Sequence, residues 1–244
     1  MVITEIFRSI QGESTHAGLP CIFVRLTGCN LRCTWCDTAY AFYGGAKRTV
    51  DDVMAEVHSL AGPPGQFSDQ SNDQSGCPHV RLVEITGGEP LLQPETPELA
   101  RRLLADGFTV LVETSGERPI AALPREVIKI MDVKCPDSGE HGTFDFANLD
   151  FLSAHDEIKF VIASRRDYDF AREFLAAHKL ADRVRQVLFA PVAPSPEGSP
   201  SGQKGSWPGL EARDLAEWIL ADRLPVRMNL QLHKFIWDPA MHGV

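Results

Sequence analysis

The sequence has 244 residues, of which 43% are hydrophobic and 23% are charged, and its formal net charge is −9. This composition is typical of a globular protein of one large domain or two small ones, and the negative charge argues against a general polyanion-binding surface. The N-terminus lacks the apolar core of a signal peptide, and no segment approaches the roughly 18 apolar residues of a membrane span. We therefore expect a cytoplasmic protein that binds neither nucleic acid nor membrane directly.

Apolar and β-branched segments alternate with amphipathic ones along the chain. Strands are expected at 21–27, 80–86, 108–114, 127–134, 157–163, 184–192 and 226–232. Helices are expected at 49–60, 96–107, 166–180 and 209–223. Thr49 is expected to be the N-cap of the first helix, and Thr96 precedes Pro97 at the first position of the second.

Most of these strands lack strict alternation of apolar and polar residues, which is typical of parallel strands buried on both faces. The alternation of strand and helix predicts an α/β fold whose functional residues lie at the carboxyl ends of its strands. The segments 62–78 and 193–209 are rich in Gly, Pro, Ser and Gln, and we expect them to be surface loops within a single domain spanning 1–244.

Three of the six cysteines, Cys29, Cys33 and Cys36, lie within eight residues of one another. In a reducing compartment such a cluster indicates metal binding or catalysis rather than disulfides. A structural zinc site needs four ligands, and Cys21, Cys77 or a histidine could supply the fourth, although Cys21 is more simply a core residue. A [4Fe–4S] cluster held by three cysteines leaves one iron open to a small molecule. The number of cysteines leaves both alternatives open.

The spacing C-x₃-C-x₂-C, with Trp35 before the last cysteine, resembles the signature of radical S-adenosylmethionine (SAM) enzymes. The GGEP stretch at 87–90 resembles the motif whose backbone binds the ammonium group of SAM in that superfamily. This resemblance implies that Cys29, Cys33 and Cys36 hold a [4Fe–4S] cluster whose open iron binds SAM, and that reductive cleavage yields a 5′-deoxyadenosyl radical. It also implies an incomplete (β/α) barrel of roughly six to seven mostly parallel strands with a reduced set of helices.

Other stretches narrow the resemblance to the 7-carboxy-7-deazaguanine synthases. These are Q-G-E at 11–13, G-L-P at 18–20, F-V-R at 23–25, G-C-N-L at 28–31, C-D-T at 36–38 and L-H-K at 232–234. The implied reaction is a lyase-type ring contraction of 6-carboxy-5,6,7,8-tetrahydropterin to 7-carboxy-7-deazaguanine with loss of ammonia, in the biosynthesis of queuosine and related 7-deazapurines of tRNA. The resemblance further implies Mg²⁺, an electron donor such as flavodoxin or ferredoxin, and a homodimer.

The resemblance assigns individual roles, with Arg25, Thr38 and His233 expected to be catalytic. Arg25 is expected to clamp the substrate carboxylate, because guanidinium suits bidentate recognition, although such a residue on its own more often forms a structural ion pair. Thr38 is expected to bind Mg²⁺, where Asp37-Thr38 would otherwise be a helix N-cap. Substrate contacts are expected from Ile10, Gln11, Gly12, Arg25, Thr86 and His233, and cofactor contacts from Trp35, Cys36, Asp37, Gly88, Ser115, Asp132 and Lys134. Glu13 is expected to support the substrate-binding loop, and Lys159 is a further candidate for the cofactor site.

The chain departs from the family pattern at three places. Ala190-Pro191 stands where family members carry Gln-Pro, Asp132-Val133-Lys134 stands where Ser-Pro-Lys is usual, and the chain continues past Pro239. Two alternatives to the synthase are a glycyl-radical-enzyme activase and a non-enzymatic zinc-binding module. The Q-G-E segment and Arg25 favour a small carboxylated substrate over a protein substrate.

Overall fold

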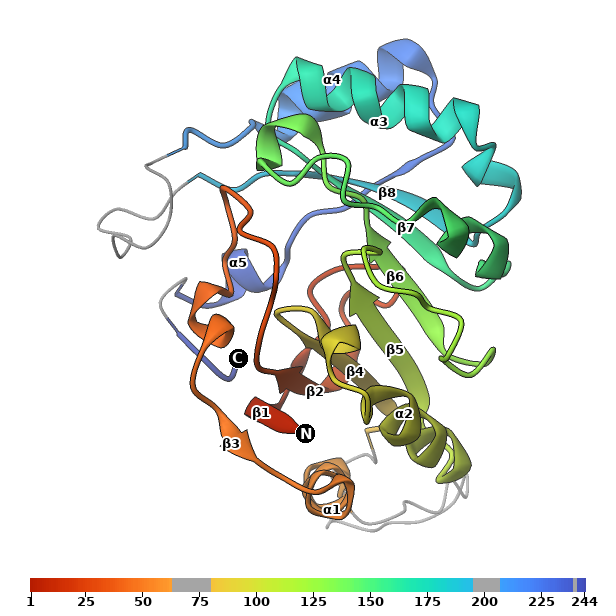
Figure 1. Cartoon of the computed structure of the whole chain (residues 1–244). Helices are drawn as coiled ribbons and strands as arrows, with labels where there is room; N and C mark the ends of the chain where they lie inside the picture. Colours follow the sequence, from red (N-terminus) through yellow and green to blue (C-terminus); the bar gives the residue numbers. More distant parts are fainter. Residues whose placement is uncertain (63–79, 195–206, 239–240) are drawn as a thin grey trace, which may run out of the picture.

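The computed structural model describes residues 1–62, 80–194, 207–238 and 241–244, so Cys77, Pro239 and most of the two expected surface loops lie outside the described residues. Its centre is a nine-stranded sheet with the order β3-β1-β2-β4-β5-β6-β7-β8-β9 (Figure 1). The strands are β1 (Val2–Ile10), β2 (Pro20–Leu26), β3 (Ala46–Lys47), β4 (Leu82–Gly87), β5 (Thr109–Thr114), β6 (Ile128–Asp132), β7 (Glu157–Ile162), β8 (Gln186–Pro191) and β9 (Arg227–Met228).

Within the described residues, five α-helices accompany the sheet: α1 (Val50–Ala61), α2 (Thr96–Ala105), α3 (Arg165–Ala177), α4 (Ala212–Asp222) and α5 (His233–Ile236). Short 3₁₀ helices are η1 (Ala39–Phe42), η2 (Pro90–Leu92), η3 (Pro136–Ser138), η4 (Phe146–Phe151) and η5 (Leu180–Asp182). None of the helices in the described ranges is long and apolar enough to cross a membrane.

The sheet is open and mostly parallel, which confirms the expected incomplete barrel. Every neighbouring pair from β2 through β9 is parallel, whereas β1 is antiparallel to both β2 and β3. All seven expected strands are present, although β9 is shortened to Arg227–Met228. The sequence analysis missed β1 and β3. Strand β1 carries Glu5 and Arg8 among its apolar residues and is only half-buried, so it lacks the continuous apolar run that marks the central strands.

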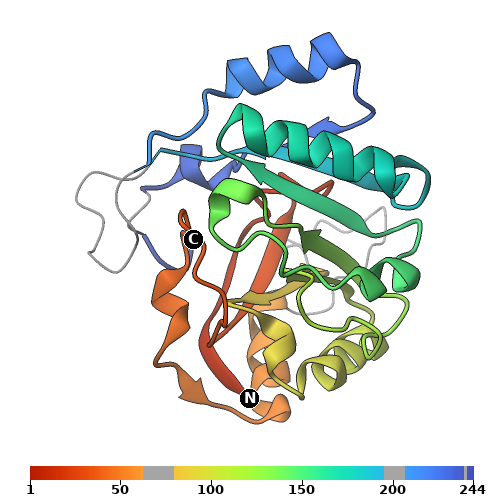
Figure 2. The same cartoon turned by 45° about the horizontal axis from the view of Figure 1, so that its top comes forward.

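The two faces of the sheet differ in character. Alternate residues of a strand point to opposite faces, and residues such as Val83, Val112 and Phe160 build the large apolar core with the helices. Helices α1 to α4 cover this outer face, while residues 27–45 and α5 lie on the inner side (Figures 1 and 2). The inner face begins with a small apolar cluster of Cys21, Leu82, Leu111 and Ile130. Above this cluster, towards the carboxyl ends of the strands, inner-facing residues become polar.

The helix ends largely match the expectation. Thr49 caps α1 by accepting from the Asp52 backbone N at 3.1 Å, and the Asp52 carboxylate accepts from the Thr49 backbone N at 3.0 Å, a complete capping box. Thr96, which was expected to precede the first helical residue, is instead the first residue of α2, and Glu95 occupies the N-cap position. The Thr96 hydroxyl instead donates to the Pro90 carbonyl at 2.7 Å, which ties α2 to the turn that follows β4.

The loop between β1 and β2, residues 11–19, crosses the inner side of the open sheet. The backbone N of Thr15 donates to both carboxylate oxygens of Glu157 on β7, at 3.1 and 3.2 Å. The Gly12 carbonyl accepts from the backbone N of Leu232, just before α5, at 2.9 Å. The loop that carries the expected substrate contacts is therefore fixed to the far half of the sheet and to the C-terminal segment.

Candidate active site

The three clustered cysteines lie on the segment that joins β2 to η1. Cys29, Cys33 and Cys36 are partly exposed and form no disulfide, whereas Cys21 is buried in the core as expected. Burial raises the pKa of Cys33 to about 11, and the nearby ammonium of Lys134 opposes that rise. The cation also opposes the rise at Cys29 and Cys36, where burial is again the largest cause. A positive group beside three thiols favours the thiolates that bind metals.

Zinc and an iron–sulfur cluster require different spacings of these thiols. Within the described ranges, no three His, Cys, Asp or Glu side chains converge as ligands of one metal ion. A tetrahedral zinc site holds its sulfurs about 2.3 Å from one point, so they must approach one another closely. In a [4Fe–4S] cluster each cysteine binds a different iron, and the sulfurs remain farther apart.

The GGEP stretch packs directly against the cysteine segment. A Cβ at Gly88 would lie 2.3 Å from the Gly28 carbonyl oxygen and 2.6 Å from the Cys29 Cβ, so only glycine permits this close approach. The backbone N of Glu89 donates to the same Gly28 carbonyl at 2.8 Å. The fully buried Glu89 carboxylate accepts from Thr114 Oγ1 and from the backbone N and Oγ of Ser115, each at 2.8 Å. The motif therefore joins the cysteine segment to the end of β5.

Replacing Gly88 by alanine should weaken cluster loading and SAM binding together. The new methyl group must displace the backbone that carries Cys29, because both atoms it meets belong to that segment. We expect SAM affinity to fall by about tenfold or more, equivalent to about 1.4 kcal/mol, with fewer irons per chain after reconstitution. Equilibrium SAM binding and iron analysis measure both effects. Normal iron content and normal SAM affinity in this variant would show that the segment can move aside at little cost.

Arg25 presents its guanidinium at the carboxyl end of β2, beside Thr86 in the register of β2 and β4. Its Nε donates to Glu5 Oε1 at 2.8 Å, and the same oxygen accepts from the Tyr40 hydroxyl at 2.7 Å. The guanidinium carbon lies 5.8 Å from the ring centroids of Phe7 and Tyr40. The structural ion pair considered from the sequence exists, but among the described residues nothing binds the two Nη groups. They remain available to a carboxylate.

The expected substrate-binding loop and the C-terminal histidine lie together. A Cβ at Gly12 would lie 2.4 Å from Nδ1 of His233, so glycine permits the contact. Gln11 is buried and donates from Nε2 to Glu84, on the inner face of β4. Burial lowers the pKa of His233, although Glu13 and Asp37 oppose the shift, and this favours the neutral imidazole near pH 7. Ile10, the last residue of β1, leads directly into this loop.

Asp132 and Lys134 lie at the carboxyl end of β6, where cofactor contacts were expected. Lys134 Nζ donates to Asp132 Oδ2 at 2.8 Å. Burial alone would lower the pKa of Lys134, but Asp132 raises it above the ordinary lysine value, so the ammonium is charged. Asp132 Oδ1 is buried and has no hydrogen-bond partner among the described residues. An orphaned carboxylate oxygen is costly, and a ligand that carries N–H or O–H donors, as SAM does, would satisfy it.

The remaining expected residues are placed as follows. Thr86 Oγ1 donates to Glu113 Oε2 at 3.2 Å, on the inner face. Thr38 occupies the N-cap position of η1, but its side chain makes no capping hydrogen bond and lies 3.8 Å from Cys36 Sγ. Asp37 pairs with Lys234 at 2.9 Å, so it faces the C-terminal segment, and Trp35 is half-buried between the last two cysteines.

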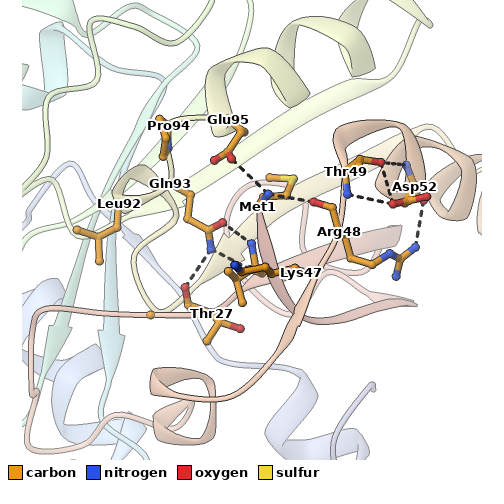
Figure 3. Close-up of a pocket in the computed structure, with 12 residues that line it drawn as sticks. Met1, Thr27, Lys47, Arg48, Thr49, Asp52, Leu92, Gln93, Pro94 and Glu95 are labelled. Atoms are coloured by element: carbon orange, nitrogen blue, oxygen red, sulfur yellow. Dashed lines mark hydrogen bonds and ion pairs between the residues drawn. The ribbon is translucent and has the colours of Figure 1, made fainter.

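A separate pocket of about 680 Å³ lies beside the first residues of β1 and the loop after η2 (Figure 3). None of the expected site residues lines it. It adjoins the cysteine segment through Gln93, whose Nε2 donates to the carbonyls of Val2 at 2.8 Å and Thr27 at 3.0 Å (Figure 3). We interpret Gln93 as a structural clamp on the strand end that precedes Cys29.

The sequence analysis did not single out several polar residues that line the inner face, namely Glu5, Glu84, Glu113 and Gln231. Burial and the neighbouring Glu113 raise the pKa of Glu84 well above its ordinary value, which favours its protonated form. A signal was present: Glu84 and Glu113 are ionisable residues inside otherwise apolar strands, at positions that share the inner face. Burial of such residues usually has a functional or electrostatic reason.

Comparisons with known proteins agree with this geometry. The model of the radical SAM superfamily matches residues 23–189. The 7-carboxy-7-deazaguanine synthase of Koribacter versatilis is 52% identical over 245 residues, covering 100% of both chains. The enzyme of the same name from Chlorobaculum tepidum is 41% identical and covers 99% of this chain and 96% of its own. The crystal structure of QueE from Escherichia coli covers 95% of this chain and 94% of its own at 23% identity, with a TM-score of 0.67, a likeness of fold. The chain therefore belongs to the 7-carboxy-7-deazaguanine synthase family of the radical SAM superfamily.

Proposed function

We propose that this chain, as a single domain over 1–244, converts 6-carboxy-5,6,7,8-tetrahydropterin into 7-carboxy-7-deazaguanine and ammonia. Substrate and product differ by one molecule of ammonia, so the reaction needs no net oxidation. One observation carries the proposal. The guanidinium of Arg25, held at Nε by Glu5 and with both Nη groups available among the described residues, lies on the strand that leads into the cysteine segment.

The residues of the inner face suit such a substrate. The paired Nη groups of Arg25 would bind its carboxylate in a bidentate manner. The reduced pterin also carries several N–H donors, and the inner face offers acceptors for them in Thr86 Oγ1, the neutral imidazole of His233 and Gln11 Oε1, which also accepts from the Glu13 backbone N. Backbone groups at Ile10 and Gly12 would complete the contacts. A polypeptide substrate would instead require an open groove, and the loop 11–19 crosses this side of the sheet.

The cofactor side lies along the carboxyl ends of β4, β5 and β6. Cys29, Cys33 and Cys36 would hold a [4Fe–4S] cluster, which together with bound SAM would supply one-electron chemistry for removing a hydrogen atom from the substrate. Gly88, through its backbone, and the Asp132–Lys134 pair would bind SAM, with Ser115 held in place by Glu89. Trp35, Cys36 and Asp37 complete the proposed cofactor contacts. Ala190 is fully buried and offers no polar side chain on the adenine side.

The proposal also covers the metal ion, the protein partners and the cellular compartment. Thr38 would provide one oxygen ligand to Mg²⁺, a cation that prefers oxygen donors. We also propose a homodimer, reduced by a small carrier such as flavodoxin or ferredoxin, that works in the cytoplasm. Its product would enter the queuosine and 7-deazapurine pathway of tRNA modification, without direct contact with nucleic acid.

The decisive experiment is an anaerobic incubation of the reconstituted protein with reductant, SAM, Mg²⁺ and 6-carboxytetrahydropterin. We expect about four irons and four sulfides per chain, and a product with the mass of 7-carboxy-7-deazaguanine. Mg²⁺ removal by chelation should lower the rate if Thr38 holds the ion. Tight zinc binding without iron uptake would support the zinc module, and radical transfer to a protein without deazaguanine would support the activase.

A further inference from the structure

Lys159 lies at the centre of a charged cluster on the inner face of the sheet. It is in the middle of β7, and its side chain is only 5% exposed. Its Nζ donates to Glu13 Oε2 at 2.9 Å and to Glu113 Oε1, and lies 3.9 Å from Asp132 Oδ2. The three carboxylates come from three different parts of the chain: the β1–β2 loop, β5 and the end of β6.

This environment keeps the lysine charged. Burial alone would lower the pKa of Lys159, but Glu113, Glu13 and Asp132 raise it well above the ordinary lysine value. Burial likewise opposes ionisation of Glu13, yet Lys159 and the nearby His233 bring the pKa of Glu13 down to about 2. An ammonium has three N–H donors and no acceptor, so one group can serve several carboxylates in different directions.

Two of the three carboxylates, Glu113 and Glu13, use their second oxygen to hold a residue in or next to the proposed substrate site. Glu113 Oε2 accepts from Thr86 Oγ1 at 3.2 Å. Glu13 Oε1 accepts from Nε2 of Gln231 at 2.7 Å, two residues before His233. A single carboxylate therefore connects the ammonium to each side of the site. Glu113 connects it to the β4–β5 side, and Glu13 connects it to the side formed by the loop 11–13 with the C-terminal segment.

We propose that Lys159 is a positioning residue that holds these two sides of the substrate site in register across the open sheet. It acts through Glu13 and Glu113. The inference rests on the proposed function. Loss of the ammonium would leave both carboxylates without their shared donor, and the loop 11–13 would lose its ionic link to β7. The substrate would then bind less tightly and in a less uniform position, while the cysteine segment would keep its own contacts.

Lys159→Met and Lys159→Arg test this role, with Lys129→Met as the matched control. Lys129 is also buried and pairs with Asp156 at 3.1 Å, but it contributes no contact to the residues of the proposed site. The Lys159→Met variant should raise the KM for the pterin by about tenfold or more, and should increase the ratio of 5′-deoxyadenosine to deazaguanine product. Lys129→Met should lower the midpoint of thermal unfolding and leave KM and product ratio unchanged.

Lys159→Arg covers the case in which Lys159→Met does not fold. Arginine keeps the charge, but its longer planar fork cannot direct donors as a compact ammonium does, so KM should still rise by about threefold or more. Wild-type KM and product ratio in either folded variant would overturn the positioning role. The wild-type assay comes first: absence of deazaguanine there would refute the proposed function, whereas active wild type with unaffected variants would refute only the role of Lys159.

Discussion

Each of the variants Cys29→Ala, Cys33→Ala and Cys36→Ala should form deazaguanine about 1,000-fold or more slowly than the wild type. This loss is equivalent to about 4 kcal/mol of activation free energy. Each thiolate would bind a different iron, so the loss of one would leave a second iron without a protein ligand, and the two remaining thiolates would not hold the cluster. The cleavage of SAM should fail together with product formation, because both depend on the same cluster. Iron and sulfide analysis after reconstitution, with 5′-deoxyadenosine measured by chromatography, reports both effects.

Two other cysteines serve as controls for this series. Cys77→Ala changes a thiol outside the described residues, and Cys135→Ala changes a thiol that is buried beside η3. Burial raises the pKa of Cys135 well above its ordinary value, as suits a core thiol that binds no metal. Both variants should keep wild-type iron content. A loss of iron in Cys77→Ala comparable to that in Cys29→Ala would mean that the ligand set differs from the one proposed.

The cysteine segment shows what local sequence can predict. Its spacing lies within eight residues, from Cys29 to Cys36, and needs no knowledge of how distant strands pair. The central strands were equally accessible, because residues such as Val83 and Ile85 give β4 a nearly continuous apolar run. Strand β1 was missed for the opposite reason, since its apolar residues are interrupted by Glu5 and Arg8 and it pairs at the antiparallel side of the sheet.

The charged cluster could not be predicted in the same way. Glu13 and Lys159 are 146 residues apart, and their contact depends on the path of the β1–β2 loop across the sheet. Asp132 meets Lys159 because the register of β6 and β7 pairs these two residues, and no local pattern determines that register. The family resemblance indicated positions such as Gly12 and His233, but only the fold shows that a side chain at Gly12 would collide with the imidazole.

Arg25→Lys should raise the KM for 6-carboxytetrahydropterin by about 100-fold, equivalent to about 2.7 kcal/mol, while substrate-independent cleavage of SAM continues. Lysine keeps the positive charge but cannot offer two parallel N–H donors, so the bidentate contact with the carboxylate is lost. The cysteine segment should be unaffected, because Arg25 forms its ion pair with Glu5 and makes no hydrogen bond to that segment. Steady-state kinetics with both products measured will separate the two effects.

Arg8→Lys on β1 is the matched control, since Arg8 is exposed and, among the described residues, its guanidinium makes only a 3.5 Å contact with the Leu60 carbonyl. Comparing Arg25→Lys with Arg8→Lys distinguishes two roles for Arg25, namely neutralising Glu5 and binding the substrate carboxylate. If Arg25 served only to neutralise Glu5, lysine would be an adequate substitute and KM would stay near the wild-type value. If the two Nη groups bind the substrate carboxylate, the charge-conserving change must still weaken substrate binding, because the lost interaction depends on the geometry of the fork and not on its charge.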